Sequence, residues 1–131
     1  MKKVCLGLFL LICAARTFAA DDPVSKVAAI IRQGKISELT ALMAENVEIS
    51  VIGDDNTYPK TQAVDALNKF LSQNKPFSVK ILHQINSNPH YRFGVLLMNT
   101  GKSVYRMALT FKEIDGTLRL IELRIELEKV K

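Results

Sequence analysis

The sequence feature that most constrains the fold is Asp115-Gly116, which stands between two runs of alternating apolar residues. A two-residue hairpin turn of type I′ needs positive φ at both central positions, and Asp-Gly is a pair that adopts this conformation readily. The flanking runs therefore predict an antiparallel hairpin in which Ile114 faces Thr117. With a two-residue loop, the same register places Phe111 opposite Leu120.

This register sorts the hairpin side chains onto two faces, because alternate residues of a strand point to opposite sides of a sheet. One face is apolar and is the expected floor for helices; it carries Val104, Ala108, Ile121, Leu123, Ile125 and Leu127. The other face is mixed and carries Leu109, Phe111, Leu118, Leu120, Glu122, Arg124 and Glu126. An apolar patch beside charges, on the second side of a sheet, predicts a partner surface or a cavity. A one-residue bulge would exchange the faces beyond it.

A third strand precedes the hairpin. Residues 93–98 form another apolar run, and Asn99-Thr100-Gly101 fits a short loop in which glycine takes the left-handed position. Gly94, inside that strand, predicts a bulge or a sharp bend. Residues 91–128 therefore predict a three-stranded antiparallel meander.

The first 19 residues have the pattern of a cleaved secretory signal. Lys2 and Lys3 form a basic start, residues 4–15 are an apolar run too short to span a bilayer comfortably, and Thr17 and Ala19 are small residues at the positions that a signal peptidase reads. We expect cleavage after Ala19 and export to the periplasm or the extracellular space. A lipoprotein signal on Cys13 is disfavoured because the preceding Ile12 is too large.

Removal of residues 1–19 changes the composition. Both cysteines, Cys5 and Cys13, are lost, so the mature chain is expected to have no disulfide and no thiol chemistry. The formal net charge falls from +5 to +2, because Lys2, Lys3 and Arg16 leave with the signal. With no basic run and no interleaving of aromatic and basic residues, nucleic acid is not an expected partner. Residues 20–131 suffice for one domain, with no stable membrane span.

Helix signals fill the first part of the mature chain. Asp22 is the expected N-cap of a helix that begins with Pro23 and ends at Gly34. Ser37 can cap a second, short helix, and a third helix is expected to start at Pro59. The buried stripe of the third helix is predicted from its apolar spacing: Ala63, Leu67, Phe70 and Leu71.

Two further strands are expected, over residues 47–52 and 77–85, where apolar and polar residues alternate. In the second of these, alternation places His83 on one face with Val79 and Ile81. Residues 53–56 are expected to form a turn between the first strand and a short return strand. Helices first and a long antiparallel sheet last predict an α+β fold.

The order of elements resembles the cone-shaped fold of the nuclear transport factor 2-like (cystatin-like) superfamily, in which a curved sheet wraps a long helix. Residues 58–63, 77–84 and 120–126 are similar to a family of short secreted bacterial proteins of unknown function within that superfamily. The resemblance implies N-terminal helices packed on a curved, mostly antiparallel sheet. It implies no activity, since a fold alone does not assign one.

Enzymes of the wider superfamily, such as ketosteroid isomerase, place an acid or base inside the cone. His83 is the candidate for that role, and Tyr58 and Tyr105 could line the same pocket. The alternative interpretation is structural: His83 is a half-buried histidine bonded to a neighbour, and the tyrosines are core aromatics with a wet hydroxyl. Adjacent Asp54 and Asp55 are expected in a turn and not at a metal; no metal and no cofactor are predicted.

The mixed face of the hairpin is a candidate interface, since a two-fold axis could set Arg124 against a carboxylate of a second copy. Its expected members are Leu109, Phe111, Leu120, Glu122 and Arg124.

Three hypotheses remain. The favoured one is a non-catalytic exported domain that binds a small apolar ligand or an envelope protein, with a homodimer as one form. The alternative is a small isomerase-like or dehydratase-like enzyme that uses His83 in the cone. The third is an interaction module whose cone is filled.

Overall fold

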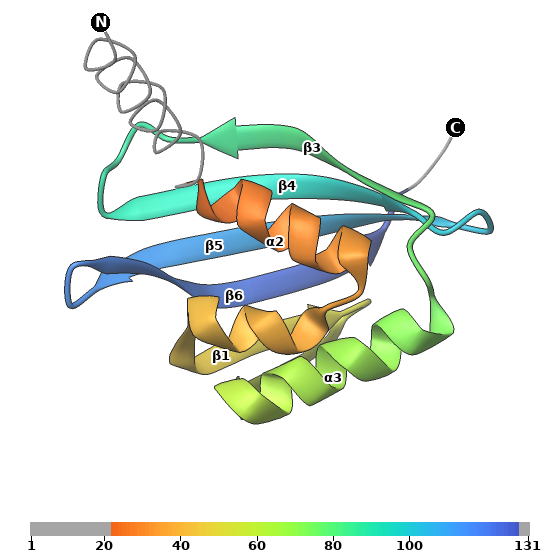
Figure 1. Cartoon of the computed structure of the whole chain (residues 1–131), viewed down its shortest axis with the longest axis horizontal. Coiled ribbons are helices and arrows are strands. Elements are labelled where there is room, and N and C mark those ends of the chain that lie inside the picture. Colours follow the sequence, from red (N-terminus) through yellow and green to blue (C-terminus); the bar gives the residue numbers. More distant parts are fainter. Residues whose placement is uncertain (1–21, 129–131) are drawn as a thin grey trace, which may run out of the picture.

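The computed structural model describes residues 22–128, in which a six-stranded sheet carries all the helices on one face (Figure 1). The predicted signal segment, residues 1–19, lies outside this range. The helices are α2 (Pro23–Gln33), the 3-10 helix η2 (Ile36–Leu42) and α3 (Lys60–Gln73). The strands are β1 (Met43–Val51), β2 (Asp54–Pro59), β3 (Ser78–Ile85), β4 (Tyr91–Asn99), β5 (Val104–Ile114) and β6 (Thr117–Leu127). Within residues 22–128, no helix is long and apolar enough to cross a membrane.

The strands lie in the order β2-β1-β6-β5-β4-β3. All neighbours are antiparallel except β1 and β6, which run parallel. The predicted α+β class, with helices on a curved and mostly antiparallel sheet, is confirmed. β6, the last strand in sequence order, therefore lies inside the sheet, between β1 of the first hairpin and β5 of the meander.

Local sequence signals account for the helix ends. The Asp22 side chain accepts a hydrogen bond from the Val24 amide at 3.2 Å, and Pro23 occupies the first turn. Gly34 ends α2 with φ 75°, in the left-handed region. Residues 36–42 form a 3-10 helix in place of the expected short α-helix, and no side-chain cap starts it.

The hydrophobic core lies between the helices and the face of the sheet that they cover, here called the inner face. The buried residues of α3 include the predicted stripe. Together with the buried residues of α2, they are joined by the inner-facing residues of every strand from β1 to β6 except β2. Its largest fully buried side chains are Phe111, Ile31, Leu39, Met43, Ile49, Leu67, Leu96, Met98, Met107, Leu109, Leu120 and Leu123.

The Asp115-Gly116 hairpin is confirmed: the φ angles are 52° and 81°, and Ile114 pairs with Thr117. The register then reaches Phe111 opposite Leu120, as predicted, but Thr110 pairs with Glu122. Ile121 is thus an extra residue, a bulge in β6.

Because of this bulge, the predicted sorting of faces is wrong beyond it. Leu123 and Ile125 pair with Leu109 and Met107 and share their buried face. The opposite side of the sheet, here called the outer face, carries Arg106, Ala108 and Thr110 of β5.

The turn between β1 and β2 also differs from the prediction. It consists of Ile52 and Gly53, with φ 47° and 85°, and not of residues 53–56. Asp54 and Asp55 therefore belong to β2. Ser50, which is fully buried, donates a hydrogen bond from its hydroxyl to the Asp55 carboxylate.

Candidate functional site

The interior of the cone is filled. Side chains that point from the sheet toward the helices, such as Leu96, Met107 and Leu123, have no exposed area. An open pocket at this place would leave part of its lining exposed, so the space between the helices and the inner face is packed core.

His83 does not lie in this interior. Ile81 pairs with Leu96 on the inner face, but the next pair is His83 with Val95, because Leu82 is an extra residue in β3. The bulge turns His83 to the outer face, where the residue is exposed. The prediction that His83 shares a face with Val79 and Ile81 is therefore wrong.

The two tyrosines are parts of the packed structure. Tyr105 is buried against Phe70, with ring centroids 5.2 Å apart, and its hydroxyl donates a hydrogen bond to Asn74 at 3.0 Å. Tyr58 is half-buried on β2 and packs against the core. Neither residue is brought close to His83 by the strand register, in which β3 pairs only with β4.

The predicted interface residues divide into two groups. Leu109, Phe111 and Leu120 have no exposed area, so their assignment to a partner surface is wrong. Glu122 and Arg124 lie on the outer face, which no described helix covers. The β6 bulge is the cause of this division, because it turns Glu122 and Arg124 to the face opposite the three apolar residues.

Cross-strand partners arrange the outer face in three rows, of which one runs from β3 to β6 and two run from β3 to β2. Across each row, the β3 side chain is basic or apolar and the middle is mainly apolar. The part of the row on β6, β1 and β2 carries at least one carboxylate, with Arg124 among them in the second row. The rows are Lys80-Leu97-Arg106-Glu126, His83-Val95-Ala108-Arg124-Ser50-Asp55 and Ile85-Phe93-Thr110-Glu122-Glu48-Thr57.

The acidic end contains a pair of carboxyl groups from neighbouring parallel strands, Glu48 and Glu122. The pKa of Glu48 is raised from its ordinary value, chiefly by a hydrogen bond with Glu122 and then by the negative charge of Glu122. Partial burial and Asp55 act in the same direction, whereas Arg124 opposes them. Arg124 also contacts Glu122 at 3.5 Å and Glu126 at 3.8 Å.

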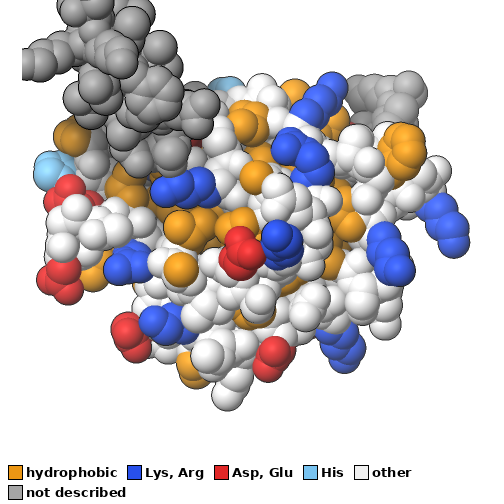
Figure 2. Space-filling view, in the orientation of Figure 1, with side chains coloured by type: hydrophobic (Ala, Val, Ile, Leu, Met, Phe, Trp, Pro, Cys, Tyr) orange, Lys and Arg blue, Asp and Glu red, His pale blue; other side chains and the backbone are white. Residues whose placement is uncertain are grey.

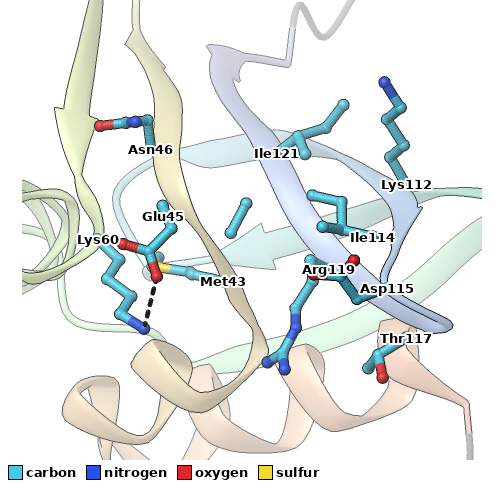
Figure 3. A pocket seen from close by; sticks show the side chains of 11 residues that line it. Met43, Glu45, Asn46, Lys60, Lys112, Ile114, Asp115, Thr117, Arg119 and Ile121 are labelled. Atoms are coloured by element: carbon cyan, nitrogen blue, oxygen red, sulfur yellow. Dashed lines mark ion pairs between the residues drawn. The ribbon is translucent and has the colours of Figure 1, made fainter.

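A hollow with a volume of about 510 Å³ lies between β1 and β6 at the Asp115-Gly116 end of the sheet (Figure 3). Met43 pairs with Leu120, but the next pair across these strands is Glu48 with Glu122. Four residues of β1 thus stand against the single bulged residue Ile121, and the two strands separate around the hollow.

This hollow was not predicted from the sequence. The consecutive apolar residues Leu120 and Ile121 break the alternation of β6 and are typical of a bulge. The sequence did not indicate that β6 pairs with β1, because β1 lies far away in the chain. Among residues 22–128, no group of three His, Cys, Asp or Glu side chains is placed to hold a metal ion.

The helix side of the molecule differs from the outer face. Figure 2 shows it with short stretches of hydrophobic atoms between the helices, among scattered Lys and Arg side chains. The outer face lies on the far side of this view.

The fold defines the class of protein. A structure from Caulobacter vibrioides described as having a cystatin-like fold matches with a TM-score of 0.60 and 12% identity, over 81% of this chain and 84% of that one. An NTF-2 like protein of unknown function from Silicibacter pomeroyi matches with a TM-score of 0.58 and 10% identity, over 80% and 89%. The chain thus has the nuclear transport factor 2-like, or cystatin-like, α+β fold.

Within that class, residues 24–126 match the family model described as a domain of unknown function, DUF4783, and the chain belongs to this family. A DUF4783 family structure from Bacteroides uniformis is similar, with a TM-score of 0.77 and 17% identity, and the match covers 83% of this chain and 100% of that one. No curated protein matches the chain.

Proposed function

We propose that the chain is an exported, non-catalytic binding domain whose docking surface is the outer face of the sheet, and that the occupant of this surface is a second copy of the chain. The observation that carries the proposal is the gradient across the outer face. Its β3 side presents Lys80 and His83, its middle is mainly apolar, and its β6 and β1 side presents carboxylates together with Arg124.

Such a gradient is complementary to itself. A two-fold axis parallel to the strands, placed between two outer faces, sets the β3 side of one copy over the β1 side of the other. Lys80 and His83 then approach the acidic side of the partner, while β5 lies at the axis and Leu97 and Val95 of β4 lie beside it. Charges of opposite sign across an interface fix its register and disfavour other partners.

The packed interior supports binding at the surface over catalysis in the cone. A catalytic His83 would need a second polar group within hydrogen-bond reach. Its cross-strand neighbour is Val95, and among residues 22–128 its side chain takes part in no hydrogen bond or ion pair.

Analytical ultracentrifugation of the exported chain tests the proposal. At about 100 µM, above the micromolar dissociation constants of weak interfaces, we expect a dimer. Leu97→Glu places a carboxylate in the apolar middle of the face and is expected to give a monomer. Phe77→Glu is the matched control: Phe77 is 82% exposed, precedes β3 and should leave the dimer intact.

A wild-type monomer at this concentration would overturn the dimer. Loss of the dimer in both variants would place the interface elsewhere. Circular dichroism of each variant establishes that the fold is retained.

A further inference from the structure

We propose that the hollow between β1 and β6 binds a small organic anion with an apolar body, of the class of aliphatic monocarboxylates. The volume of about 510 Å³ falls within the range of about 300–1,000 Å³ for small-molecule sites. This inference goes beyond the proposed function and is independent of the oligomeric state.

The hollow exists because two parallel strands part. Residues 44–47 of β1 and Ile121 of β6 have no partner across the strand boundary. Main-chain N–H and C=O groups that would pair in a regular sheet therefore border the hollow, and they require water or a ligand as a partner. A regular β1–β6 pairing would have closed this space.

The walls combine apolar and cationic groups. Ala44, Ile114 and Ile121 supply apolar surface, and Lys60, Lys112 and Arg119 supply three positive charges. Figure 3 shows Lys60 and Arg119 extending toward the same end of the hollow from opposite walls, while Lys112 points to the other end.

The acidic groups of the hollow do not satisfy these cations. Lys60 Nζ lies 3.9 Å from Glu45, whose side chain is 90% exposed, so water screens this pair. Asp115 also borders the hollow but forms no ion pair with another described residue.

Arg119 has free donors as well. It donates one N–H to the carbonyl of Ala41 at 2.7 Å, which fixes the guanidinium and leaves the other N–H groups for a ligand. A carboxylate between Arg119 and Lys60 can receive charge-assisted hydrogen bonds from both. An aliphatic chain on that carboxylate would extend along Ala44, Ile114 and Ile121.

Octanoate is a suitable probe, with n-octylammonium as a probe of opposite charge and acetate as the head group alone. In an amide NMR titration of the exported chain, octanoate is expected to shift resonances of residues 43–46 and 119–121, with a dissociation constant on the order of 1 mM for a ligand of this size. Lys60→Gln is expected to weaken binding about tenfold. Lys69→Gln removes an equal charge from the exposed side of the same helix and should leave binding unchanged.

A second variant tests the apolar wall: Ile114→Asn should weaken octanoate and leave the weaker acetate response unchanged. The proposal is overturned if octanoate causes no shifts at these residues, if n-octylammonium binds as tightly, or if Lys69→Gln loses as much affinity as Lys60→Gln. Acetate binding as tightly as octanoate would overturn the apolar part of the ligand class.

Discussion

At Gly94 of β4, α2 packs directly against the backbone of the sheet. A Cβ atom placed there would lie 2.6 Å from Cγ1 and 2.7 Å from Cγ2 of Val24, which is fully buried. The sequence indicated a bulge or bend at this glycine, but β4 pairs with β5 without interruption and the reason for the glycine is contact with the helix.

Gly94→Ala is therefore expected to destabilise the fold by about 2 kcal/mol, the usual cost of overpacking a core, as measured by urea unfolding. The double variant Gly94→Ala with Val24→Ala should lose less than the sum of the two single changes, because the smaller side chain makes room for the methyl group. Additive losses would show that the two residues do not compete for space.

Ile52 presents a different case, because the residue is 51% exposed and its backbone is strained. A branched side chain at φ 47° is rare, and this residue is the first of a two-residue hairpin turn for which asparagine is preferred. Ile52→Asn is expected to raise the free energy of unfolding by about 1 kcal/mol.

The control for this change is Ile114→Asn, which alters another exposed isoleucine next to a hairpin turn, at a position with ordinary φ. It should bring no gain in stability. An equal gain in both variants would mean that the effect comes from removing exposed apolar surface and not from the turn.

At the scale of elements, the pairing of β1 with β6 controls a pH response. Because the pKa of Glu48 is raised above its ordinary value of 4.5, the folded protein binds this proton more tightly than the unfolded chain does. The stability that this group contributes is therefore present at low pH and falls as the pH rises from about 4.5 through the raised pKa.

Glu48→Gln cannot ionise, so the variant should not lose stability as the pH rises through the raised pKa of Glu48. We expect a higher melting temperature than wild type at pH 7 and no difference at about pH 3, well below the ordinary value of 4.5, where Glu48 is protonated in both states. Glu38→Gln changes an exposed carboxyl on η2 and should follow the wild-type profile. If the melting temperatures of Glu48→Gln and wild type differed by the same amount at every pH, the raised pKa of Glu48 would be contradicted.

The elements also show what the sequence could predict. Cap residues and apolar spacing gave α2 and α3, and Asp115-Gly116 gave the β5–β6 turn, because these signals act over a few residues. The assignment of faces failed after Ile121, since both sides of β6 carry apolar residues and only packing against Met107 and Leu109 selects one. The same limitation placed His83 on the wrong face, because a bulge of one residue exchanges the two faces for all later side chains of the strand.

The hollow between β1 and β6 could not be predicted for a different reason. It requires two strands about 70 residues apart to lie parallel and to lose their register at one place. No local pattern reports such a pairing.

At the scale of the whole molecule, the proposal of export makes a simple prediction. Intact mass spectrometry of the protein recovered from the periplasm or medium should show a chain that begins at Ala20, because Thr17 and Ala19 provide the small residues that the peptidase needs.

Ala19→Leu should leave the precursor uncut, since the residue before the cleaved bond must be small. Lys129→Gln changes a residue far from that bond and should be processed normally. Recovery of the uncleaved wild-type chain would contradict the predicted signal.

The parallel pairing of β1 with β6 also determines when the molecule can fold. Residues 43–51 gain their central neighbour only after residue 127 has been made, so a nascent chain holds an incomplete sheet until β6 is available. Contacts between such distant segments form slowly, because a long loop must close first. For the export proposed above, a late closing step of this kind would keep the growing chain in the extended form that a protein-conducting channel accepts, and it would delay burial of the core until β6 has passed through.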